Sequence, residues 1–187
     1  MPPGDVRTTW LGHAAFKFDC PAGMVVYVDP WLGNPRCPES LKQVGQAAAI
    51  LVTHGHFDHI GDSVDIAEKT SAKVVCKFEI SVWLESQGVR SAMGMNRGGT
   101  VNLDGIRITM VSSDHSSGIS GDSGIVDGGT AAGFVVQFEN DYKVYHAGDT
   151  NVFGEMRPIG ELYAPDVALL PIGDYYTMSP TEAAIAV

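Results

Sequence analysis

Short apolar or alternating runs, bounded by glycine, proline, asparagine and aspartate, recur along the chain and predict β-strands. The first three runs follow one another through short turns and predict an antiparallel meander. A strand, helix, strand, helix order follows, with helices predicted over residues 60–69 and 79–87. The predicted strands cover residues 8–10, 14–18, 24–28, 47–52, 73–76, 100–103, 106–111, 132–138, 143–146 and 167–170. The pattern therefore predicts an α/β fold.

Three segments add detail to this order. The run at 47–52 is continuous rather than alternating, as expected of a strand that is buried on both faces. Asp104-Gly105 suits a tight primed turn and predicts a hairpin around it. Residues 112–130 are rich in serine, glycine and aspartate, and we expect them to form a long loop beside a functional site.

The last predicted element is a helix that starts at residue 179. Ser179 is the expected cap, Pro180 takes the first helical position and Glu182 follows three residues after the cap. The chain reaches Val187 inside this apolar stretch, and so short a helix must pack on something. We expect residues 1–187 to form a single domain that lacks its C-terminal segment.

Composition narrows the class of protein. A chain of 187 residues with 44% hydrophobic residues is large enough for one domain with a substantial core. No run approaches the roughly 18 to 20 apolar residues of a membrane span, and the N-terminus does not resemble a signal peptide, so we expect a cytoplasmic protein. The net charge of −10, without a basic cluster, makes nucleic acid an unlikely partner. The three scattered cysteines indicate ordinary buried thiols.

The densest chemistry lies directly after the predicted strand at 47–52. The segment Thr53-His54-Gly55-His56-Phe57-Asp58-His59 carries three imidazoles and a carboxylate, which are ligands for zinc and its neighbours. His54 and His56 alternate, so in an extended stretch they point to the same side and can bind one ion. Asp58 and His59 fall where a helix is expected to begin and can face a second ion. A solvated polar loop is a poor explanation for this spacing.

Two later residues extend the candidate site. Asp149 follows a predicted strand in a Gly-Asp-Thr turn, where its carboxylate can bridge two ions; a plain turn aspartate is the alternative. His115 lies in the polar loop and can be the third imidazole on the ion held by His54 and His56. The alternative for His115 is an exposed loop histidine.

These motifs resemble the metallo-beta-lactamase superfamily. The order His-x-His-x-Asp-His, a later lone histidine and a later Gly-Asp-Thr is typical of that superfamily. The segments Leu11-Gly12-His13-Ala14-Ala15-Phe16, Val28-Asp29-Pro30-Trp31, Tyr145-His146-Ala147-Gly148-Asp149-Thr150 and Leu170-Pro171-Ile172-Gly173-Asp174 are similar to its poorly characterised metal-dependent hydrolase branch. That branch is akin to ascorbate-phosphate lactonases and N-acyl-phosphatidylethanolamine phospholipases. The resemblance covers essentially the whole chain and implies an αββα four-layer sandwich.

The resemblance also implies a binuclear centre of two divalent ions, zinc or alternatively manganese. Carried over by motif, one ion takes His54, His56 and His115, and the other takes Asp58 and His59, with Asp149 shared. The superfamily completes the second site with a histidine beyond the point where this chain ends. The second site is therefore expected to be incomplete, or to be completed by water, a partner chain or a following segment.

Other residues near these motifs have two interpretations. His13 resembles a position near the metal centre, where it contacts substrate or moves a proton, but a structural histidine is an equal alternative. Asp29 either orients a ligand imidazole or only forms a turn before Pro30. His146 is expected to be packed rather than catalytic. Three residues after the last strand either line the pocket or form a surface turn: Asp174, Tyr175 and Tyr176.

The sequence therefore predicts a metal-dependent hydrolase. A metal-bound hydroxide would attack an ester, lactone, amide or phosphodiester bond of a small-molecule substrate, with Asp58 and His13 in catalytic roles. A nuclease of the same superfamily is one alternative, against which the acidic charge argues. A metal-binding protein with a degenerate site is another. Association into a homo-oligomer would cover the open sheet edge left by a missing final strand.

Overall fold

Two β-sheets form the centre of the protein. The structure is a computed structural model and describes residues 4–187. The first sheet has the order β1-β2-β3-β4-β5-β6, and the second has the order β13-β12-β11-β8-β7. The first contains β1 (Arg7–Trp10), β2 (Phe16–Asp19), β3 (Val25–Val28), β4 (Ala49–Leu51), β5 (Lys73–Lys77) and β6 (Ala92–Met95). The second contains β7 (Thr100–Leu103), β8 (Ile106–Ser112), β11 (Ala132–Gln137), β12 (Lys143–His146) and β13 (Val167–Leu169).

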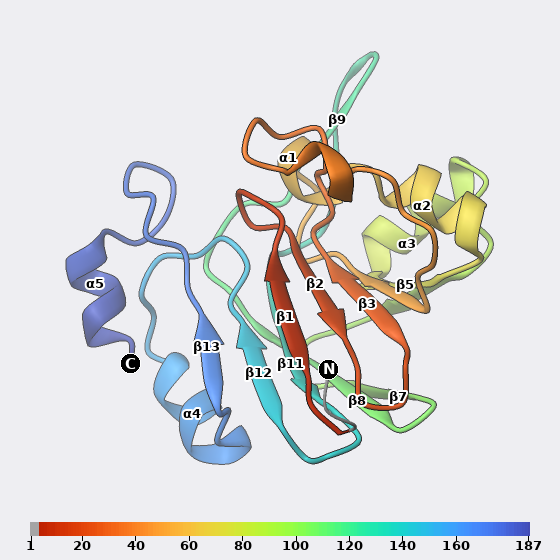
Figure 1. The fold of residues 1–187 in the computed structure, drawn as a ribbon. Helices are drawn as coiled ribbons and strands as arrows, with labels where there is room; N and C mark the ends of the chain where they lie inside the picture. Colours follow the sequence, from red (N-terminus) through yellow and green to blue (C-terminus); the bar gives the residue numbers. More distant parts are fainter. Residues whose placement is uncertain (1–3) are drawn as a thin grey trace.

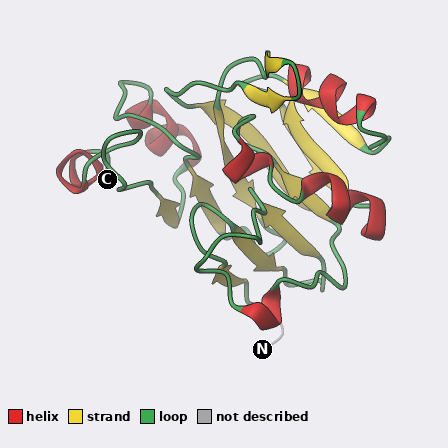
Figure 2. Ribbon diagram, turned by 90° about the horizontal axis from the view of Figure 1, so that it is seen from above, coloured by secondary structure: helices red, strands yellow, loops and turns green. Residues whose placement is uncertain are grey.

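Helices cover the outer face of each sheet (Figures 1 and 2). The helices α2 (Ser63–Thr70) and α3 (Phe78–Ser86) pack on the first sheet through a core that includes Ile66, Ile80 and Val74. The helix α4 (Met156–Tyr163) packs on the second sheet, and α5 (Pro180–Ile185) lies beside it. The short elements α1 (Phe57–Ile60) and η1 (Glu39–Leu41) lie in connections. The predicted αββα sandwich is confirmed.

The central core lies between the two sheets. Alternate residues of each strand point into it, such as Val26 and Val28 from the first sheet and Ile108, Met110 and Phe134 from the second. The strand β4 is buried at every residue, as predicted from its continuous apolar run. It contributes Ala49 and Leu51 to this core and Ile50 to the core under the helices. Burial on both faces therefore fixes the position of the strand that leads into the histidine cluster.

Most of the predicted elements are present. The meander β1-β2-β3 is antiparallel, and β3, β4, β5 and β6 then pair in parallel. The hairpin between β7 and β8 turns at Asp104 and Gly105, which both have positive φ as a primed turn requires. Ser179 caps α5 in a capping box with Glu182. The cysteines are all buried and free, as expected.

The structure also corrects several predictions. The helix predicted over residues 60–69 starts later, at Ser63 as α2, because Gly61, with φ of +42°, separates it from the short helix α1 that ends at Ile60. A Cβ on Gly61 would lie 2.7 Å from the Pro30 carbonyl oxygen, so the break lets the two segments meet closely. The predicted loop at 112–130 contains a hairpin of β9 (Ile119–Gly121) and β10 (Gly124–Val126), which extends away from the sandwich (Figure 1). The strand β6 and the helix α4 were not predicted.

Within residues 4–187, no helix has the length and apolar character that crossing a membrane would require.

Candidate metal centre

The candidate ligands meet at one end of the sandwich because each follows the end of a strand. The histidine-rich segment comes after β4, His115 comes after β8 and Asp149 comes after β12. The backbone N–H of Ala132 donates to the Thr53 carbonyl at 3.0 Å and joins the two sheets at this end. Gly148, with φ of +66°, packs so closely on Thr53, which follows β4 of the first sheet, that an added Cβ would lie 2.9 Å from the Thr53 Cβ. Close contact between the sheets therefore sets the position of Asp149.

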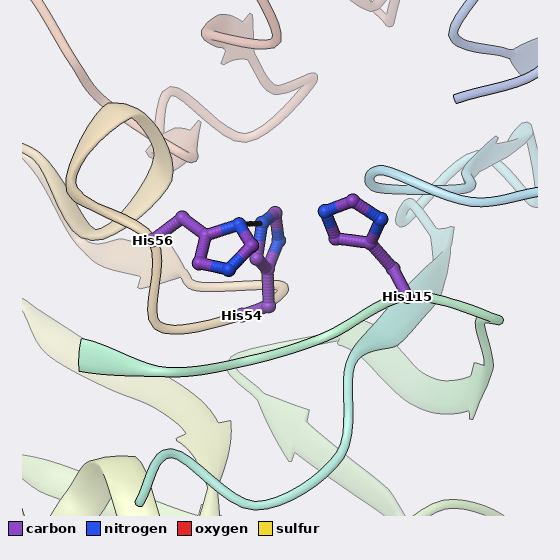
Figure 3. Close-up of side chains that lie close together, drawn as sticks. All are labelled: His54, His56 and His115. Carbon is purple, nitrogen blue, oxygen red and sulfur yellow. Dashed lines mark hydrogen bonds between the residues drawn. The ribbon is translucent and has the colours of Figure 1, made fainter. Parts of the chain in front are cut away.

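His54, His56 and His115 form the first group of candidate ligands. One ring nitrogen from each lies within 4.8 Å of the others, and Figure 3 shows the three rings turned toward one another. His54 Nε2 and His56 Nδ1 are 3.0 Å apart. Burial lowers the pKa of His54 well below its usual range, and it also lowers the pKa of His115. The neutral imidazole favoured by these shifts is the form that binds a metal ion.

A second group lies next to the first and contains His59 with the carboxylates of Asp58 and Asp149. Asp149 Oδ2 is 3.3 Å from His59 Nε2, and Asp58 Oδ2 is 4.0 Å from the same nitrogen. His13 Nε2 lies 3.0 Å from Asp58 Oδ2, and His13, His59 and Asp149 can present one ligand atom each within 4.8 Å. Asp149 Oδ2 is also 3.9 Å from His115 Nε2. Asp149 therefore lies between the two groups.

The electrostatics of the second group favour a bound cation. Burial would raise the pKa of Asp58, but the hydrogen bond from His13 and the charge of His59 lower it to about 2. Burial would also raise the pKa of Asp149, which the contact with His59 lowers instead. The pKa of His59 is lowered by burial but raised more strongly by Asp29 and Asp149, to about 10. The contacts with Asp29 and Asp149 thus favour the protonated ring of the buried His59. A divalent cation can take the place of the proton on its Nε2 atom.

Asp29 fixes the orientation of two candidate ligands through buried hydrogen bonds. Its Oδ2 lies 2.8 Å from His59 Nδ1 and accepts a hydrogen bond from Thr53 Oγ1 at 2.6 Å, while its Oδ1 accepts from the Thr53 backbone N–H at 2.8 Å. Because Thr53 Oγ1 donates to Asp29, it accepts from His54 Nδ1, which is 3.0 Å away. The hydrogen-bond network therefore assigns the Nδ1 proton of both histidines and leaves each Nε2 facing the site.

Residues of this supporting network were not all found from the sequence. The contact of Asp29 with His59 fits one of its two interpretations, that it orients a candidate ligand. Thr53 received no role, although it stands directly before His54. Ser116 was also missed; its Oγ lies 3.2 Å from His56 Nε2. A polar residue at the strand end next to a ligand is the signal that points to Thr53. Nothing in the sequence pattern marks Ser116.

The structure places the four remaining candidates in different surroundings. His146 is buried, donates from Nε2 to the Ala14 carbonyl at 3.0 Å and accepts from the Gly148 backbone N–H at 3.2 Å, so it is packed as predicted. Asp174 and Tyr176 line a pocket of about 1090 Å³ that also includes several of the candidate metal ligands. Tyr175 is exposed and is not among the lining residues, so the surface-turn interpretation holds for it.

This geometry agrees with comparisons to known proteins. A family model of the beta-lactamase superfamily domain matches residues 24–187. The chain belongs to the metallo-beta-lactamase superfamily. It is 51% identical over 182 residues to a UPF0173 metal-dependent hydrolase of Koribacter versatilis, covering 97% of this chain and 78% of the relative. It is 53% identical over 185 residues to one of Rubrobacter xylanophilus, covering 98% and 76%.

A solved structure supports the same superfamily. The metallo hydrolase Igni18 from Ignicoccus hospitalis superposes with a TM-score of 0.85 and 39% sequence identity, covering 97% of this chain and 76% of that one. The predicted superfamily, its fold and an enzyme of the metal-dependent hydrolase type are confirmed. The assignment of residues 1–187 to a single domain stays a prediction.

Proposed function

We propose that this chain is a hydrolase of small-molecule esters, lactones or phosphodiesters that works with two zinc-type ions. The observation that carries the proposal is the position of Asp149, whose Oδ2 lies 3.3 Å from His59 Nε2 and 3.9 Å from His115 Nε2. A carboxylate between two groups of nitrogen ligands suits a binuclear centre. Manganese is the alternative metal for the same nitrogen and oxygen donors.

The donor set fits two ions. His59 Nε2 is buried without a well-aligned hydrogen bond, which is a costly state for a polar atom unless another group binds there. His54, His56 and His115 would hold one ion. Asp58, His59 and Asp149 would hold the other, with Asp149 shared. When bound, a zinc-type ion would lower the pKa of a water ligand to about 7 and polarise the bond under attack.

The side chains of this chain supply orientation and proton transfer. Asp58, whose pKa is about 2, stays ionised and faces the pocket, where it can accept a hydrogen bond from the attacking water and so orient it. His13 Nε2 lies 3.0 Å from Asp58 Oδ2, and the ring lines the pocket, where it is placed to contact the substrate or to move a proton to or from it. Asp29 keeps the ring of His59 in a single orientation through Nδ1.

Metal content and turnover of the purified protein test the proposal together. We expect two ions per chain in the wild type and the loss of both metal and hydrolysis of a generic lactone or phosphodiester in His56→Ala and Asp149→Ala. Asp65→Asn, an exposed aspartate of α2, is the matched control and should change neither quantity. Full turnover in either ligand variant would contradict the proposal, and so would one ion or none with no activity across a substrate panel.

A cytoplasmic location and association into homo-oligomers stay predictions. No contact of the described residues favours a nuclease, and the net charge of −10 still argues against one.

A further inference from the structure

The outer part of the pocket is built from exposed apolar side chains. Four residues line it and also face solvent: Trp10 is 50% exposed, Phe57 63%, Ile172 60% and Tyr176 76%. They come from the end of β1, the start of α1 and the segment after β13. Large apolar side chains gathered at the mouth of a pocket mark a surface that binds something apolar.

Aromatic contacts connect this mouth to the metal ligands. The Trp31 ring packs edge to face against Phe57 at 5.6 Å between centroids, and against His13 at 5.5 Å. His13 packs in turn against His59 at 5.1 Å. The Trp10 indole N–H donates to the His13 carbonyl at 2.8 Å. Trp10 and Phe57 are therefore held in place next to the reacting centre, and neither is an isolated surface residue.

The interior of the pocket continues the same character. Its wall includes the apolar residues Phe16, Ala168, Leu169, Leu170 and Pro171. The volume of about 1090 Å³ is slightly above the usual range of about 300–1,000 Å³ for small-molecule sites. Such a pocket has room for more than an acetyl group beside the bond that is cleaved.

Apart from the proposed metal ions, the pocket wall offers no positively charged side chain to an anionic group on the substrate. Besides Tyr176, its ionisable side chains are the aspartates at 58, 149 and 174 and four histidines, and no lysine or arginine is among the lining residues that the structure describes. Phosphate and carboxylate groups are commonly bound by arginine forks or lysine ammonium groups, which this wall lacks. The carboxylate of Asp174 would repel a negatively charged group of the substrate at the mouth of the pocket.

We propose that the substrate is an uncharged ester or lactone with an apolar acyl chain or ring, which packs against Trp10 and Phe57. This inference rests on the proposed hydrolase and selects one substrate class within it. In the reaction, the oxygen of water forms the new bond to the acyl carbon and the acyl–oxygen bond breaks. The alcohol oxygen takes one proton of the water, and the new acid releases the other to solvent. An ester releases a separate alcohol, whereas a lactone opens to a single hydroxy acid.

Chain-length dependence of the metal-loaded protein tests this inference. We expect kcat/KM for p-nitrophenyl octanoate to exceed that for p-nitrophenyl acetate at least 10-fold, and to exceed that for bis(p-nitrophenyl) phosphate at least 10-fold. Burying each additional methylene favours binding of the longer chain. A flat series, or a preference for the anionic phosphodiester, overturns the inference while the proposed hydrolase stands. Turnover of none of these compounds contradicts the proposed function itself.

Two variants test the aromatic contact directly. Trp10→Ala and Phe57→Ala should each reduce the octanoate-to-acetate ratio of kcat/KM at least fivefold, mainly through KM for the octanoate. Leu162→Ala removes an exposed apolar side chain of α4 that is not among the lining residues, and should leave the ratio unchanged. Melting curves identify any variant that fails to fold, and Phe57→Ser provides a second substitution at the more exposed position. A ratio that is unchanged in folded Trp10 and Phe57 variants overturns the inference.

Discussion

The Nδ1 atom of His59 lies 2.8 Å from Oδ2 of Asp29, and both side chains are completely buried. The same carboxylate oxygen accepts a hydrogen bond from Thr53, which in turn accepts one from His54. One aspartate of the loop after β3 therefore sets the orientation of one histidine in each candidate metal site. Such supporting contacts determine how well a ligand binds its ion.

Replacing Asp29 should weaken metal binding. The Asp29→Asn side chain would present an N–H₂ group where the carboxylate now accepts, so at least one of the three donors around it loses its partner. We expect the affinity for metal in the His59 site to decrease by about 10- to 100-fold. Isothermal titration calorimetry with zinc measures this affinity, and Asp65→Asn is the control variant. An unchanged affinity would show that Asp29 only forms a turn.

The role of the Thr53 hydroxyl in orienting His54 can be tested separately, because one substitution removes the hydroxyl and another keeps it. Thr53→Val keeps the shape of the side chain but removes the acceptor for His54 Nδ1, so the orientation of that ring is no longer fixed. We expect zinc affinity at the site of His54, His56 and His115 to decrease by about 10-fold or more. Thr53→Ser, which keeps the hydroxyl, should retain most of the affinity. Equal behaviour of the two variants would contradict this role.

The stability of the metal-free protein should depend on pH through His59. Its pKa is about 10 in the folded protein, above the ordinary value of 6.5, so protonation of this ring stabilises the fold. The contribution is fully present below pH 6.5 and is lost as the pH rises through about 10. We expect the free energy of unfolding to decrease by more than about 1 kcal/mol over this interval, since one pKa unit corresponds to about 1.4 kcal/mol.

Urea unfolding of chelator-treated protein across that pH range measures this dependence. His59→Gln is the comparison, because it removes the titrating group and should flatten the curve between neutral pH and pH 10. A wild-type curve parallel to that of His59→Gln would show that the two carboxylates do not stabilise the imidazolium.

The cysteines should be inert in the native protein. Burial raises the pKa of Cys20 and of Cys76 to about 12 each, and it also raises the pKa of Cys37. Because the thiolate is the reactive form, we expect the thiols to react with Ellman's reagent at pH 8 at least about 100-fold more slowly than in denaturing guanidinium. Rapid labelling of any thiol under native conditions would contradict the burial of that residue.

The sequence determined the strand order along the chain and the identity of the candidate ligands. The continuous apolar run before Thr53 predicted a doubly buried strand, and the spacing from His54 to His59 predicted a pair of ligand groups. These features are local, because side-chain alternation and turn residues act over a few positions. The break at Gly61 and the strand β6 escaped prediction, since each depends on a neighbour that is distant in the sequence. For Gly61 that neighbour is the Pro30 carbonyl.

Only the tertiary structure decided how the local pieces combine. It placed Asp149 between the two histidine groups, assigned the Nδ1 protons of His54 and His59 through Asp29 and Thr53, and paired His13 with Asp58. It also brought Trp10, Phe57 and Tyr176 around one pocket without a lysine or arginine among its described lining residues. The physical reason is that contacts between segments far apart in the chain depend on how the two sheets pack. A single sequence carries no periodic signal for such contacts.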